Sequence, residues 1–203
     1  MKKKTDILIR LIKFFAGLAI IQFAVACFLE ISIGSDSFTV FIEGLSKVLP
    51  ITVGMANIGF TLVLLVVVYF LDKSQVKIGM VLAVVFAGII LDGMTIVADY
   101  IIIKDAPWYL VALEFAITCC VVSIGFPLMK SANLGVAPND ALYLALVKKT
   151  GKPYGLIRSL TDAVYLIFGY LCGGVVGLGT LICVVAIGPM MQFVMAHIIK
   201  QDE

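Results

Sequence analysis

The sequence predicts an all-α membrane protein: six transmembrane helices in two inverted three-helix repeats, each with a short extra helix after its first crossing. Three observations predict it: the composition, six long apolar segments and an internal repeat. Of the 203 residues, 62% are hydrophobic and 14% are charged, whereas soluble domains are about 45–50% apolar and about 25% charged. This balance and a mean hydropathy of +1.14 exclude a soluble globular protein. We therefore expect residues 1–203 to form a single transmembrane domain in contact with the lipid bilayer.

Six apolar segments are long enough to cross a membrane as helices. A crossing helix needs roughly 20 residues, and open strands would leave backbone groups without hydrogen bonds in hydrocarbon. The segments are Leu11–Ile33, Gly54–Leu71, Ile78–Ile103, Trp108–Met129, Tyr154–Cys172 and Val175–Ile199.

The distribution of basic residues predicts the orientation of these crossings. Lysines and arginines gather in the first 15 residues and in the second and fourth connections, and such residues are enriched in cytoplasmic loops. We expect a multi-pass protein of the bacterial inner membrane with both termini in the cytoplasm. A cleaved signal peptide would also start with basic residues, but this apolar stretch continues to Ile33 and can span. The net charge of +2 is too small to indicate a nucleic-acid partner.

An internal repeat divides the chain into halves of about 8–104 and 107–200. Sliding the sequence by 101 residues aligns Gly34 with Gly135, and each half has the same order of long and short segments. Three crossings per half is an odd number, so the two halves must insert in opposite orientations, as in many transporters. Chance similarity between apolar sequences is the alternative.

Two short segments, Asp36–Leu49 and Pro138–Thr150, follow the first crossing of each half. A helix of this length covers about 20 Å, less than the hydrocarbon thickness of about 30 Å. Each is either re-entrant or lies at the membrane interface. A re-entrant start would direct backbone N–H groups at a polar or anionic solute, which makes Asn139 and Asp140 candidate binding residues, with Ser, Asp or Asn as helix caps.

Few polar side chains lie inside the predicted crossings, and such residues are functional candidates because their burial is costly. Asp92 lies near the middle of the third crossing, and its repeat partner Gln192 lies at the matching depth. We expect Asp92 to bind a proton or cation, with a pKa raised by desolvation. The alternative is an Asp satisfied by a neighbouring helix.

Arg158 and Asp162 lie one turn apart on the fifth crossing and can pair along one helix face. Their repeat partners are Asn57 and Thr61, so both helices carry a polar face. We expect Arg158 to hold a carboxylate or phosphate while Asp162 and Asn57 complete the binding site; alternatively, Arg158 extends to the headgroups.

The sequence contains no nucleophile with a neighbouring base, no phosphate loop and no metal-ligand spacing. We expect no enzyme, cofactor or metal site. The cysteines lie in apolar segments and are expected to be buried free thiols; they are Cys27, Cys119, Cys120, Cys172 and Cys183.

Several motifs in the second half combine glycines with turn residues. They are Gly135-Val136-Ala137-Pro138-Asn139-Asp140-Ala141-Leu142, Gly155, Leu178-Gly179-Thr180 and Gly188-Pro189. With these motifs the chain from about Gly34 onward resembles the YczE/YyaS/YitT-like family of small bacterial integral membrane proteins. The resemblance implies a small multi-spanning membrane protein and supplies neither a substrate nor catalytic residues.

The function predicted from these features is transport of a small polar or anionic solute through a site at the interface of the two repeats. A channel with the same cavity, or a non-transporting scaffold or accessory subunit, is the alternative. The sequence leaves open the solute, the coupling ion and whether the protein forms a homo-oligomer.

Overall fold

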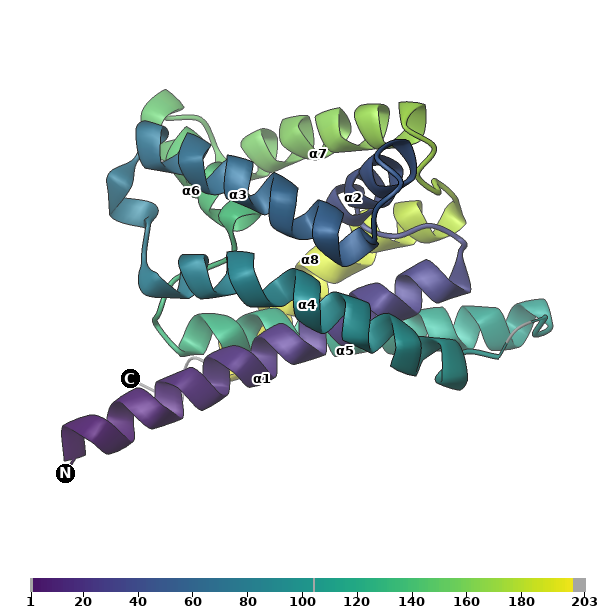
Figure 1. Cartoon of the computed structure of the whole chain (residues 1–203), viewed down its shortest axis with the longest axis horizontal. Coiled ribbons are helices and arrows are strands. Elements are labelled where there is room, and N and C mark those ends of the chain that lie inside the picture. Colours follow the sequence, from purple (N-terminus) through teal and green to yellow (C-terminus); the bar gives the residue numbers. More distant parts are fainter. Residues whose placement is uncertain (1, 104, 199–203) are drawn as a thin grey trace. The chain divides into compact units, whose positions relative to one another are not determined.

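The computed structural model describes residues 2–103 and 105–198, and within them it contains helices and connecting turns but no strand (Figure 1). The all-helical prediction is confirmed. Both halves run in the same order: a long helix, a short one and two further long ones. The elements are α1 Lys2–Ile31, α2 Ser37–Val48, α3 Val53–Leu71, the 3-10 helix η1 Lys73–Gln75, α4 Ile78–Ile101, α5 Trp108–Ser131, α6 Pro138–Thr150, α7 Tyr154–Leu171 and α8 Leu178–Ile198.

Four helices in the described part of the chain are long and apolar enough to cross a membrane. They are α3, α4, α5 and the segment Asp6–Ile31 of α1, while Leu178–Ile187 of α8 is a shorter apolar stretch. Helix α7 is 18 residues long and contains two charged residues, Arg158 and Asp162. The multi-spanning character is therefore confirmed, and the fifth and sixth crossings stay predictions.

Helix boundaries follow local chemistry. The Thr52 hydroxyl accepts a hydrogen bond from the Met55 backbone N–H at 3.1 Å and caps the start of α3. Helix α6 begins at Pro138, whose fixed φ suits a first helical position, and ends before Gly151 at φ 68°. The expectation of a Ser, Asp or Asn cap is wrong for α6, since the residue before it is Ala137, which makes no side-chain cap.

The chain forms two compact units, and each draws on both halves of the sequence. Unit 1 comprises Met1–Asp36, Ile90–Asn133 and Val176–Glu203, which carry α1, α5, α8 and the second half of α4. Unit 2 comprises Ser37–Ile89 and Leu134–Val175, which carry α2, α3, α6, α7 and the first half of α4. The short helices thus both belong to unit 2.

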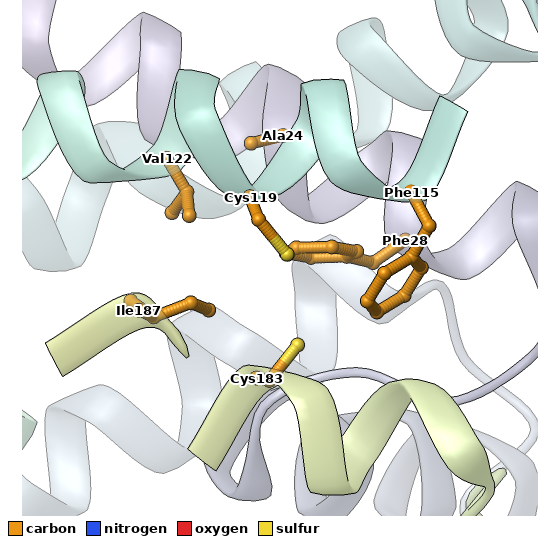
Figure 2. Close-up of a cluster of buried hydrophobic side chains, with 7 residues drawn as sticks. All are labelled: Ala24, Phe28, Phe115, Cys119, Val122, Cys183 and Ile187. Carbon is orange, nitrogen blue, oxygen red and sulfur yellow. The ribbon is translucent and has the colours of Figure 1, made fainter. Parts of the chain in front are cut away.

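In unit 1, α1 and α8 both pack against α5. At Gly17 of α1 an added Cβ would lie 2.5 Å from the backbone nitrogen of Met129 on α5, so only glycine permits this contact. Figure 2 shows the core of the unit, which α1, α5 and α8 build together; its buried residues are Ala24, Phe28, Phe115, Cys119, Val122, Cys183 and Ile187.

All five cysteines are free thiols. Cys27, Cys119 and Cys183 are buried as expected, but Cys120 is exposed, because it lies one position beyond the face of α5 that meets the core. The side chains of Cys119 and Cys183 belong to the same buried cluster, and their sulfur atoms point toward each other (Figure 2).

In unit 2, α2 packs against α7 and α3, and α6 packs against α3 and α7. Val68 of α3, Met80 of α4 and Ala141 of α6 form a buried cluster with 0% exposure each. This arrangement joins each short helix to long helices of both halves.

Candidate functional site

The loops before the two short helices have the same backbone conformation. Ser32 and Asn133 both have φ 56°, and two residues later Gly34 and Gly135 have φ 108° and φ 122°. Glycine is required there because side chains disfavour a positive φ. These pairs are the ones that the internal repeat aligns.

Each of these loops accepts a backbone hydrogen bond from the first turn of a long helix. In unit 2 the N–H of Gly79 on α4 donates to the Leu134 carbonyl at 2.9 Å, and in unit 1 the N–H of Gly179 on α8 donates to the Ile33 carbonyl at 2.9 Å. Each bond joins one half of the sequence to the other, and the two bonds are related by the repeat.

A lysine near the C-terminal end of each short helix, α2 and α6, makes a contact with a distant turn of unit 2. Lys47 of α2 donates to the Gly173 carbonyl at 2.9 Å and to Glu43 at 2.7 Å. Its repeat partner Lys148 of α6 donates to the Asp72 carboxylate at 2.8 Å. Position 72 is the repeat partner of position 173, so both lysines reach the turn that follows the third helix of the opposite half.

The carboxylate of Asp72 is further held by its own turn. The hydrogen bond from Lys148 makes the largest contribution to lowering the pKa of Asp72. The Ser74 hydroxyl also donates to the carboxylate, at 2.7 Å. Together these donors hold the pKa of Asp72 well below its ordinary value, because they stabilise the ionised form.

Three helices of unit 2 meet at one carboxylate, that of Asp162 on α7. The hydroxyl of Ser37, the first residue of α2, donates to Oδ1 at 2.7 Å, and the hydroxyl of Tyr143 on α6 donates to the same oxygen at 3.0 Å. Nε of Arg158 lies 3.6 Å from Oδ2. We call Ser37, Tyr143, Arg158 and Asp162 the Asp162 cluster.

Burial differs across the Asp162 cluster. Tyr143 is only 2% exposed, while the side chains of Asp162 and Arg158 are 21% and 38% exposed. The guanidinium also lies over the Tyr143 ring, 5.8 Å from its centroid, where the ring face attracts a cation. Arg158 is therefore the most exposed member of the Asp162 cluster.

A group of four aromatic side chains lies next to the Asp162 cluster along α7. Rings from α2, α3 and α7 lie with centroids 4.6 to 6.1 Å apart. Tyr165 is one turn beyond Asp162, and its ring is among them; the members are Phe38, Phe41, Phe60 and Tyr165.

Two buried polar atoms of unit 2 have no hydrogen-bond partner among the residues that the structure describes. They are the Tyr165 hydroxyl and Oδ1 of Asn57, on residues 4% and 7% exposed. Such atoms are costly to bury alone, which makes both positions places where a ligand or water is favoured.

The structure shows where several of the predicted site residues lie. It confirms the pairing of Arg158 with Asp162 and buries Asn57 on α3. Asp140 lies in the first turn of α6. Asn139, beside it, is half-buried.

The other predicted pair, Asp92 with Gln192, lies partly outside the described part of the chain. Asp92 is half-buried in the part of α4 that belongs to unit 1. Gln192 is a residue of α8, but its side chain lies outside the described part. The pairing of Asp92 with Gln192 stays a prediction.

Sequence reasoning missed two tyrosines in or beside the Asp162 cluster, Tyr143 and Tyr165, and it considered serines at the starts of the short helices only as helix caps. Tyr165 lies three positions after Asp162 and seven after Arg158, a spacing that places all three on one helix face. That spacing was the available signal for Tyr165. The contact of Tyr143 needs the packing of α6 on α7, which the sequence does not contain.

Taken together, the apolar helices and the ionisable cluster define an α-helical, multi-spanning membrane protein. The chain belongs to the family of unknown function DUF6198, which matches residues 8–196. This membership is consistent with the resemblance found in the sequence motifs, since the relatives below carry the same names.

Three relatives are similar to this chain. The uncharacterized membrane protein YczE of Bacillus subtilis (strain 168) is 24% identical over 191 residues, covering 94% of this chain and 87% of the relative. The uncharacterized protein YyaS of the same strain is 24% identical over 187 residues, covering 91% of each. An uncharacterized protein of Haemophilus influenzae is 33% identical over 69 residues, covering 34% and 32%. No solved structure matches the chain.

Proposed function

We propose that this protein is a transporter of a small polar or anionic solute in the bacterial inner membrane, and that the solute binds at the Asp162 cluster. One observation carries the proposal. Unit 2 of a chain that is 62% hydrophobic concentrates a carboxylate, a guanidinium and two hydroxyl donors at the meeting point of α2, α6 and α7. Ionisable groups among membrane helices are expensive and mark solute or ion pathways.

The contacts assign different roles within the cluster. Asp162 already accepts two hydroxyl donors on Oδ1, so it acts as an orienting group. Arg158, more exposed than Asp162, binds the carboxylate or phosphate of the solute, since a guanidinium matches such groups with paired N–H donors. Asp140 and Asn139 at the start of α6 and the buried Asn57 contribute further polar contacts.

The proposed architecture is two inverted repeats with six crossings and both termini in the cytoplasm. The paired loop conformations, the two backbone hydrogen bonds of the loops and the two lysine contacts support a duplicated unit, because each has a counterpart at the aligned position. Three crossings per half then require opposite insertion. Asp92 and Gln192 are the proposed coupling pair for a proton or cation.

Reconstituted protein tests the proposal. Proteoliposomes on a solid-supported membrane are exposed in turn to jumps of inorganic phosphate, sulfate, acetate and lactate, and the charge movement is recorded. We expect a saturable signal with one of these anions. Arg158→Gln and Asp162→Asn should abolish it, because the first removes the anion contact and the second removes the charge that orients it.

Two matched controls lie outside the cluster. Lys152→Gln removes an exposed positive charge close to the start of α7. Asp105→Asn makes the same chemical change as Asp162→Asn at an exposed turn with φ 59°, a conformation that asparagine tolerates. Both controls should transport like the unchanged protein. Equal loss in controls and cluster variants, or a linear, non-saturating signal as in a channel, would contradict the proposal. So would the absence of a signal with every anion, as expected of a scaffold.

A further inference from the structure

An open cavity of about 340 Å³ lies at the surface of unit 1, and none of its lining residues belongs to the Asp162 cluster. A single buried water needs only about 10–15 Å³ on this kind of measure, so the space accommodates a group of many atoms. Residues of α1, the last residue of α5 and the loop after it line the cavity: Asp6, Ile9, Arg10, Lys13, Ser131 and Asn133.

The lining on α1 is a consequence of helical spacing. Asp6, Arg10 and Lys13 follow one another at intervals of four and three residues, which places them on one face. The lining therefore presents two cationic groups and one carboxylate, with a net positive charge. Guanidinium and ammonium groups bind phosphate through charge-assisted hydrogen bonds, and the Asn133 amide adds donors and an acceptor.

The position of the cavity along α1 suits a membrane interface. The apolar segment that can cross a membrane starts at Asp6, so the stretch from Asp6 to Lys13 covers about the first 10 Å of that segment at 1.5 Å per residue. Three further lysines, Lys2, Lys3 and Lys4, precede it in the sequence, and this end of α1 carries the N-terminus label in Figure 1.

Apolar side chains are exposed at the cavity and beside it. Ile9, which lines the cavity, is 47% exposed. Ile7 and Ile12, which are 52% and 59% exposed, flank the lining face of α1 on either side, because successive residues of a helix are turned by about 100°. A ligand with a charged head and hydrocarbon chains would place its head in the cavity and its chains against these residues, whereas a soluble anion has no chains to place there.

We propose that this cavity binds the headgroup of an anionic phospholipid, phosphatidylglycerol. Its phosphate contacts Arg10 and Lys13, its glycerol hydroxyls contact Asp6 and Asn133, and its acyl chains lie along the exposed apolar residues of α1. The net positive lining favours an anionic lipid over phosphatidylcholine, which has no net charge and no hydroxyl group for the Asp6 carboxylate. Basic pockets between membrane helices are known headgroup sites.

Native mass spectrometry of the full chain, titrated with phosphatidylglycerol or phosphatidylcholine, tests the proposal. The unchanged protein should bind phosphatidylglycerol preferentially. The double variant Arg10→Gln/Lys13→Gln should bind it about 30-fold more weakly, because each basic residue near the membrane surface contributes about 1 kcal/mol to binding an anionic lipid. Arg10→Lys/Lys13→Arg keeps both charges and should keep the affinity within a few fold.

The matched control is Lys149→Gln/Lys152→Gln, which removes the same charge from exposed positions in unit 2. It should leave phosphatidylglycerol binding unchanged. An equal loss of phosphatidylglycerol binding in this control would mean that the overall charge of the protein, and not this cavity, determines binding, and it would overturn the proposal. Equal affinity for both lipids would overturn it too, as would tight binding of glycerol phosphate or inorganic phosphate alone that competes with the lipid, because the ligand would then be a free phosphate.

Discussion

Replacing Tyr143 by phenylalanine removes one oxygen atom from unit 2 and keeps the aromatic ring. The lost atom donates to Asp162 at 3.0 Å from a residue that is 2% exposed. Hydrogen bonds to charged groups contribute about 1.5–3 kcal/mol in soluble proteins, and those between membrane helices contribute about 0.6 kcal/mol on average and at most about 1.7 kcal/mol. The two ranges meet at about 1.5 kcal/mol, which is the expected loss of stability.

A loss of this size is measurable as a change in melting temperature. For a chain of 150–250 residues, 1 kcal/mol corresponds to about 2–4 °C, so Tyr143→Phe should melt about 3–6 °C lower in detergent. Differential scanning fluorimetry of the purified protein measures this. Tyr170→Phe is the control, because Tyr170 lies on α7 and is 68% exposed.

A double-mutant cycle with Ser37→Ala sharpens the test. Ser37 and Tyr143 donate to the same oxygen of Asp162, so their contributions should not add. The reasoning is refuted if Tyr143→Phe melts within 1 °C of the control, an interval well below the about 3 °C expected, or if the two substitutions are strictly additive.

Two further predictions concern packing and pH. Gly88→Ala should destabilise the protein by about 1–3 kcal/mol, because its Cβ would lie within van der Waals overlap of the Gly54 carbonyl; Gly93→Ala on the same helix has nothing within 4 Å and should gain up to about 1 kcal/mol. Equal melting temperatures of the two variants would contradict this packing. For pH, the lowered pKa of Asp72 means that its contact with Lys148 stabilises the fold above the ordinary pKa of about 3.9 and loses this effect as acid protonates the folded carboxylate. The difference in melting temperature between the unchanged protein and Asp72→Asn should therefore stay constant from pH 7 down to about 3.9 and shrink at lower pH, and a difference that stays the same below that pH would contradict the reasoning.

The sequence was informative where a property depends on neighbours along the chain. The short segment predicted at Pro138–Thr150 is helix α6 with the same bounds, since a proline start and a glycine end are local signals. The pairing of Arg158 with Asp162 was predictable for the same reason, because residues four apart share a helix face.

Contacts between distant segments were not predictable in this way. Nothing in the sequence around Ser37 indicates that its hydroxyl meets Asp162, 125 positions later. The exposure of Cys120 beside the buried Cys119 depends on which face of α5 the other helices cover, and the apolar run itself has no polar side to reveal it.

By itself the sequence determined that the chain is helical and lipid-embedded, because backbone groups in hydrocarbon need internal partners and apolar side chains need no water. It also aligned Gly34 with Gly135, and both of these glycines have a positive φ in the structure. Only the tertiary structure decided that helices from both halves interleave within each unit and that α2, α6 and α7 meet at one carboxylate. The reason is that apolar helices pack through shape at positions far apart in the chain, and the order of residues along one helix does not specify its neighbours.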